Sequence, residues 1–256
     1  MLRMSKTALQ RSMNGRHNVL SLDFFRFAVI WKILSSNLYN AAQSRVVFEP
    51  PPLGLSSKSH TTLVGRLPEE LSSTIIEAVQ PLRSASGEHY FYPASTIHVT
   101  VRNFDLLAQR LCSQEVVAEK VQEFISGFSE VRMRAKGLNV SPTTVFVQLF
   151  PCNKDFKSLR RGLNEMEGRQ FAECSFGHLK KDLTAANLLM KNMAFANVMR
   201  FAGVLSPSVV KYVSVNRWRD FGEFSLRELE LVSTDRYLSS SGTKIIKSFS
   251  LTGNSR

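Results

Sequence analysis

The sequence predicts an α+β fold of mostly antiparallel strands with helices between them, arranged in two similar lobes. Two observations predict this fold class. Short runs rich in β-branched residues alternate with stretches whose apolar residues recur at helical spacing, and the alternation continues through both halves of the chain. Hydrophobic residues make up 43% and charged residues 21% of the 256 residues, a balance typical of a chain that folds around a core.

The first half of the predicted domain has the clearer pattern. A helix is expected over 68–82 because a proline and two acids precede apolar residues at Leu71, Ile75, Val79 and Leu82. The remaining elements predicted here are strands over 61–67, 96–104, 131–140 and 144–150, and helices near 114–127 and 154–167.

The second half repeats the alternation less regularly. Ser206 is a potential N-cap and Pro207 stands at the first helical position, so a helix is expected from there. A helical stretch near 182–193, a strand over 195–201 and closing strands over 224–233 and 243–251 complete the prediction.

The N-terminal region differs from the rest in charge and composition. Of the formal net charge of +12, half comes from the first 60 residues, which hold eight basic and two acidic side chains. Residues 48–60 are rich in proline, glycine and serine and are typical of a linker, which predicts an extension over 1–59 and a domain over 60–252. The acid-free opening resembles a mitochondrial targeting segment, and a cytoplasmic protein with a basic arm is the alternative.

No cofactor, metal site or integral membrane segment is predicted. The three cysteines (Cys112, Cys152, Cys174) are odd in number and lack CxxC spacing, which argues against zinc binding and against a disulfide framework. The apolar stretch after residue 17 is interrupted by Asp23, Arg26 and Lys32, so it predicts an amphipathic helix rather than a membrane span.

The strand around IHVTV carries the main functional signal. His98 and Thr100 project from one face of a strand, while Ile97, Val99 and Val101 project from the other face toward a core. An imidazole titrates near neutral pH and can transfer a proton, and a threonine hydroxyl can hydrogen-bond a phosphate oxygen. His98 and Thr100 are therefore the candidate catalytic residues, although the tripeptide also occurs by chance in strands.

The segment HYFYPASTIHVTVRNF resembles the first signature of the two-histidine (2H) phosphoesterase superfamily, which includes 2'-5' RNA ligase-like proteins and 2',3'-cyclic phosphodiesterases. The resemblance extends over about residues 60–252. It implies two lobes around a central cleft, with one His-x-Thr/Ser motif in each lobe. It also implies that one histidine activates water, the other protonates the leaving oxygen, and the hydroxyl residues hold the phosphate.

The second motif of the family is incomplete in this chain. The segment AFANVMRF matches the family's pattern at Arg200-Phe201, and on that alignment Phe195 stands at the histidine position and Asn197 at the threonine position. The alternative is Tyr212-Val213-Ser214, but its surroundings favour a helix. Phe195 could stack on a base, whereas Asn197 and Arg200 could bind a phosphate. Alternatively, these residues belong to a domain that is kept only as a scaffold.

Two basic groups are further candidate ligands. His178, next to Lys180 and Lys181, could replace the missing histidine or bind an anion, although such loop residues are usually solvated. One face of the strand over 131–140 carries Arg132, Arg134 and Lys136, which suits either solvent exposure or an RNA track.

Three functions follow from these residues. The first is a phosphodiesterase acting on RNA ends or cyclic nucleotides. The second is an RNA- or nucleotide-binding protein whose activity is lost because the second motif reads Phe195-x-Asn197. The third is a structural subunit of an RNA-containing assembly, joined to it through the N-terminal extension.

Overall fold

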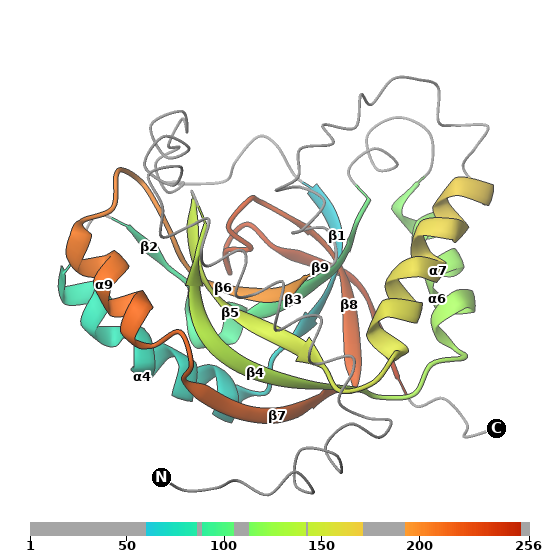
Figure 1. Ribbon diagram of the computed structural model, residues 1–256. Coiled ribbons are helices and arrows are strands. Elements are labelled where there is room, and N and C mark those ends of the chain that lie inside the picture. The colour runs from blue at the N-terminus through green and yellow to red at the C-terminus, as the bar shows by residue number, and fades with distance from the viewer. Residues whose placement is uncertain (1–59, 86–88, 105–112, 142, 171–192, 252–256) are drawn as a thin grey trace, which may run out of the picture.

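The fold is seen in a computed structural model, which describes residues 60–85, 89–104, 113–141, 143–170 and 193–251. Within these residues the chain forms two antiparallel sheets with helices packed on their outer sides (Figure 1). The prediction of an α+β fold with antiparallel strands and outer helices is therefore confirmed. The extension over 1–59 and the predicted helix over 182–193 lie outside the described residues.

The first sheet has four strands in the order β3-β1-β8-β9, and all neighbours are antiparallel. Strands from the beginning and the end of the domain thus lie side by side. Their bounds are β1 His60–Arg66, β3 His98–Asn103, β8 Glu228–Thr234 and β9 Lys244–Ser250.

The second sheet has five strands in the order β2-β6-β5-β4-β7, again antiparallel throughout. Most of its strands come from the middle of the chain, between the two pairs that build the first sheet. Their bounds are β2 Tyr90–Phe91, β4 Val131–Val140, β5 Thr144–Pro151, β6 Ala194–Arg200 and β7 Asp220–Leu226.

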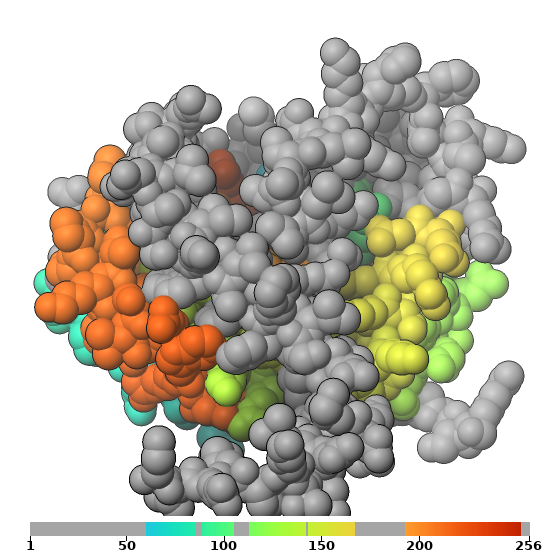
Figure 2. Space-filling model, in the orientation of Figure 1, coloured from blue at the N-terminus to red at the C-terminus, as the bar shows by residue number. Residues whose placement is uncertain are grey.

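Two helices cover each sheet. Helices α6 (Gln114–Ile125) and α7 (Asp155–Gln170) pack on the first sheet, whereas α4 (Glu69–Ala85) and α9 (Pro207–Val215) pack on the second. In Figure 2, α7 (yellow) and α9 (orange) lie on opposite sides of the molecule. Helix α4 directly follows β1 in the sequence but packs on the sheet that lacks β1, so the two lobes are interleaved along the chain.

The predicted strand over 224–233 was wrong in one respect. The structure divides this segment at Arg227, so that β7 ends at Leu226 in the second sheet and β8 begins at Glu228 in the first. The alternation of buried and exposed residues changes phase at the crossing, where Arg227 and Glu228 are both exposed between buried Leu226 and Leu229. This phase change was the sequence signal that the prediction missed, because a shift of one residue moves the side chains to the other face of a strand.

Each sheet has one face in the main core and one face that carries polar residues. Val99 and Val101 of β3 and the preceding Ile97 are buried in the core, and the same core takes Ala194, Ala196 and Val198 of β6. We call the opposite faces of the two sheets the polar faces. Their residues include His98 and Thr100 in the first sheet and Phe195 and Asn197 in the second.

Candidate functional site

His98 and Thr100 lie together on the polar face of β3, as the alternation predicts. In the pairing with β1, His98 lies directly opposite Arg66, and Thr100 lies opposite Val64. A bulge after Thr100 lets Arg102 pair with Leu63, a core residue, and Arg102 donates a hydrogen bond to Asn164 of α7. The bulge therefore separates Arg102 from the two motif residues.

His98 is held in its neutral form with one ring nitrogen free. Its Nδ1 lies 2.8 Å from the carbonyl oxygen of Thr96, and a carbonyl only accepts, so Nδ1 carries the hydrogen and Nε2 is left as an acceptor. Burial lowers the pKa of His98 to about 4, and the nearby cations Arg66 and Arg200 lower it further. The ring is thus an uncharged base at neutral pH, with 8% of the residue exposed.

Strands β3 and β6 lie next to each other although they belong to different sheets. Arg160 of α7 joins them, because its guanidinium donates to the carbonyls of Thr100 (3.0 Å), Val101 (3.1 Å) and Met193 (2.9 Å). At the other end the Tyr92 amide donates to Val198 O at 3.1 Å, and the Tyr92 ring lies 6.4 Å from the His98 ring between centroids. The two strands therefore run in opposite directions, with His98 near the 197–200 end of β6.

The predicted second motif does lie on the neighbouring strand. Asn197 pairs with Phe146 and Phe195 pairs with Gln148 across β5, which places both on the polar face of the second sheet. The Phe195 ring packs against Phe146 with centroids 5.1 Å apart, so this ring contacts another phenylalanine. Asn197 has a buried side-chain oxygen without a hydrogen-bond partner. Neither residue carries an imidazole, so β6 offers the apolar ring of Phe195 and the amide of Asn197 at these two positions.

Arg200 approaches His98 and is held by two tyrosines. Its Nε donates to the Tyr92 hydroxyl at 3.3 Å, and its guanidinium lies 5.5 Å from the centre of the Tyr237 ring. Tyr90 packs edge-on against both tyrosine rings, at 5.1 and 4.9 Å. Burial, followed by the effects of Tyr92 and Asp235, raises the pKa of Tyr90 to about 12, so this phenol keeps its proton at neutral pH.

We call His98, Thr100, Phe195, Asn197 and Arg200 the central site. The sequence did not predict its supporting residues, which are Arg66, Tyr90, Tyr92, Arg160 and Tyr237. Tyr90 and Tyr92 belong to the segment HYFYPASTIHVTVRNF, but nothing local marks the other three. The Arg66 guanidinium is oriented by an ion pair to Glu230 at 2.7 Å and by a hydrogen bond to Ser95 O at 2.8 Å.

The remaining candidates lie elsewhere. Tyr212 and Ser214 belong to helix α9, and the Tyr212 hydroxyl donates to Ala78 O at 2.6 Å, so the helical interpretation of this segment is confirmed. His178 lies outside the described residues. The His89 ring accepts a hydrogen bond from the Ala202 amide at 3.3 Å, which is a structural role.

The basic face of β4 is largely neutralised by β7. Arg132 pairs with Glu223 at 3.3 Å, and Arg134 pairs with Asp220. These arginines are half-exposed and their charges are balanced within the sheet, which favours the solvent-exposed interpretation over an RNA track.

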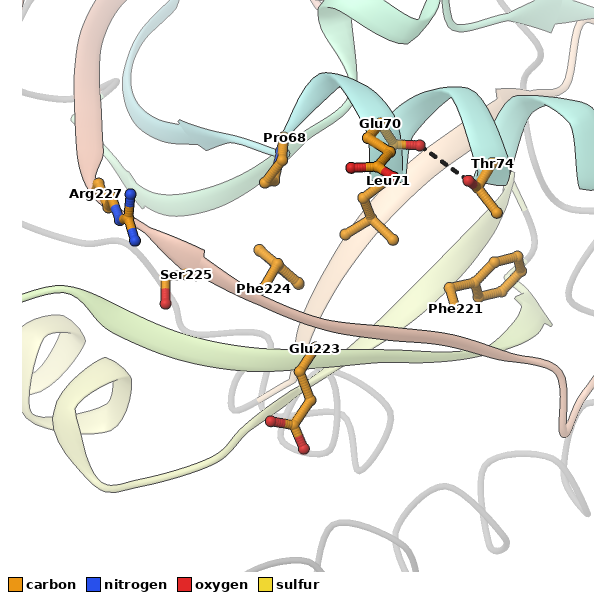
Figure 3. Close-up of a pocket in the computed structure, with 9 residues that line it drawn as sticks. All are labelled: Pro68, Glu70, Leu71, Thr74, Phe221, Glu223, Phe224, Ser225 and Arg227. Carbon is orange, nitrogen blue, oxygen red and sulfur yellow. Dashed lines mark hydrogen bonds between the residues drawn. The ribbon is translucent and has the colours of Figure 1, made fainter.

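A separate hollow of about 550 Å³ lies between the start of α4 and strand β7 (Figure 3). Its lining residues are Pro68, Glu70, Leu71, Thr74, Phe221, Glu223, Phe224, Ser225 and Arg227. In the sheet order β7 is three strands from β6, or roughly 14 Å at ordinary strand spacing, so this hollow is not part of the central site.

Solved structures share this fold. TT0787 of Thermus thermophilus matches 76% of this chain and 98% of its own length, with 17% identity and a TM-score of 0.54. The protein ATU0111 of Agrobacterium tumefaciens matches 83% of this chain and 100% of its own, with 13% identity and a TM-score of 0.50. The apo form of E. coli LigT matches 77% and 99%, with 15% identity and a TM-score of 0.47.

Neither a protein-family model nor a curated protein matches this sequence. At identities of 13–17% the structural likeness shows the fold alone. The two-sheet fold that the sequence resemblance implied is therefore confirmed. None of the described helices is long and apolar enough to cross a membrane.

Proposed function

We propose that this protein binds the phosphate of a nucleotide or of an RNA end between the polar faces of its two sheets, on a phosphoesterase-like scaffold that has lost two-histidine turnover. One observation carries the proposal. His98 and Thr100 lie on β3 beside β6, and β6 carries Phe195 and Asn197, which the sequence resemblance aligns with a second histidine and threonine. The resemblance of the sequence to 2H phosphoesterases supports it as well.

The chemistry of the central site suits phosphate binding better than cleavage. Opening a cyclic phosphate needs one group to remove a proton from water and another to protonate the leaving oxygen. His98 can perform only one of these tasks in a given protonation state, and Phe195 can perform neither. Thr100, Asn197 and Arg200, by contrast, can all donate hydrogen bonds to phosphate oxygens.

A phosphodiesterase is the second candidate. The neutral His98 ring with a free Nε2 favours it, because this is the state that a general base requires at neutral pH. The second proton-transfer group would then be water or His178. A structural subunit of an RNA-containing assembly, anchored by the basic extension over 1–59, is a further proposal, as is a mitochondrial location.

Binding and turnover can be measured on the same full-length protein. We expect 2',3'-cyclic nucleotides to bind the wild-type chain, and Thr100→Ala to weaken that binding about tenfold, with little hydrolysis in either case. Hydrolysis that disappears in His98→Ala would instead establish the phosphodiesterase. The absence of binding by wild-type protein would overturn both and would favour the structural role. Ser126→Ala, at the exposed end of α6, is a matched control for loss of a hydroxyl.

A further inference from the structure

Three side-chain amides lie on neighbouring strands of the second sheet, next to the central site. Asn139 of β4, Phe146 of β5 and Asn197 of β6 form one cross-strand row, and Gln148 lies in the next row opposite Phe195. We call these five residues the amide strip. Asn139 has no exposed surface and Gln148 has only 2%, so these polar groups are as deeply buried as core residues.

Two of these amides have oxygens without partners. The Asn139 Nδ2 donates to Gln148 Oε1 at 3.3 Å, which orients the Asn139 amide and directs its oxygen away from that bond. The Oδ1 atoms of Asn139 and Asn197 are both buried and make no hydrogen bond. Buried side-chain oxygens are normally satisfied by protein, water or ligand. Because both unpartnered atoms are acceptors, the group that completes them must be a donor.

The strip also contains two phenylalanine rings. The Phe146 and Phe195 rings pack at 5.1 Å with an angle of 50°, and they stand among the three amides. Aromatic rings beside amide groups suit a planar heterocycle, which stacks through its face and forms hydrogen bonds through its edge.

The amide strip adjoins the residues that are proposed to bind the phosphate. Asn197 belongs both to the strip and to the central site, and Asn139 lies two strands farther on, roughly 10 Å away at ordinary strand spacing. A nucleotide whose phosphate contacts His98 and Thr100 would therefore extend its base along this row.

We propose that the amide strip recognises a nucleobase with an exocyclic amino group, through the side-chain oxygens of Asn139 and Asn197. Adenine, cytosine and guanine carry such a donor, whereas uracil has a carbonyl oxygen where cytosine has its amino group. Uracil therefore offers no exocyclic amino group to these oxygens, so the strip favours the amino bases. This inference rests on the proposed phosphate binding.

The test compares the dissociation constants of 2',3'-cyclic AMP, CMP and UMP for the full-length protein, by calorimetry. We expect the adenosine and cytidine compounds to bind about 10- to 100-fold more tightly than the uridine compound, as for a hydrogen bond to an otherwise unpartnered buried group. Asn139→Leu, of similar size, should reduce this preference to about threefold or less while leaving the affinity for the uridine compound nearly unchanged. Asn164→Leu on α7, on the far side of the first sheet, should keep the full preference.

The outcomes separate this inference from the proposed function. Equal affinity of the wild-type protein for all three nucleotides would overturn base recognition but would leave phosphate binding standing. Such a result would mean that a water molecule completes the two oxygens. A preference that persists in Asn139→Leu would also overturn the assignment. If no nucleotide binds, the proposed function itself fails.

Discussion

The substitution Arg160→Met tests whether one buried arginine holds the two motif strands together. Methionine keeps the apolar stem but removes the donors that bind the carbonyls of Thr100, Val101 and Met193. Three charge-assisted hydrogen bonds contribute about 6 kcal/mol in total at about 2 kcal/mol each. Removing the cation also removes the cost of burying its charge. That cost is about 3 kcal/mol, because burial, and secondarily Arg102, lowers the pKa of Arg160 to about 10. The net loss of stability is then about 3 kcal/mol.

The assay is urea unfolding of the full-length protein at pH 7, followed by circular dichroism and by tryptophan fluorescence. The neighbouring Arg161→Met is the matched control, since that side chain is 75% exposed and makes only a 4.0 Å pair with Glu165. The control should change stability by less than about 0.5 kcal/mol. If Arg160→Met unfolds at the same urea concentration as the control, the three carbonyl contacts do not hold β3 against β6.

Three further predictions follow from particular residues. The folded-state pKa of His98 is about 4 and the unfolded value is 6.5, so the free energy of unfolding should fall by up to about 3 kcal/mol as pH decreases from 6.5 to 4. Urea unfolding at pH 7 and at pH 4.5 should show a smaller decrease in this free energy for His98→Asn than for the wild-type protein. The double variant Phe195→His/Asn197→Thr should raise hydrolysis of 2',3'-cyclic nucleotides by about 100-fold or more, and an inactive double variant would show that more than these groups is missing. Gly162→Ala should lower stability by about 1–2 kcal/mol in thermal unfolding because its Cβ would overlap the Phe124 ring, and an unchanged or raised Tm would mean that the ring moves aside without cost.

The positions of single elements were readable from the sequence because they depend on local periodicity. The helical spacing of Leu71, Ile75, Val79 and Leu82 predicted α4, and all four side chains are buried. Likewise, the alternation around His98 separated the polar pair from the core residues of β3. The spacing of apolar residues along an element shows which of its faces is buried. It does so whichever other element packs against that face.

The sequence did not predict in the same way which elements and side chains pack against one another. The break in alternation at Arg227 and Glu228 marks an interruption of the strand, but it does not show that the chain leaves one sheet there and enters the other. Arg160 stands in a helix where an arginine is usually solvated, yet it is largely covered and donates to two carbonyls of β3 and to the carbonyl just before β6. Arg200 was a candidate phosphate ligand, but its contacts with Tyr92 and Tyr237 were not predictable, because those residues lie more than 30 positions away.

The sequence by itself determined the α+β class and the placement of His98 and Thr100 on one face of a strand, and it predicts Phe195 at the position of a second histidine. Only the tertiary structure decided that β6 lies against β3, that Arg66 and Arg200 approach His98, and that the amides of Asn139 and Asn197 share a row. The physical reason is the range of the interactions. Periodicity reports burial within one element, whereas the protonation state of His98 and the unpartnered amide oxygens depend on side chains that only the packing of separate strands brings together.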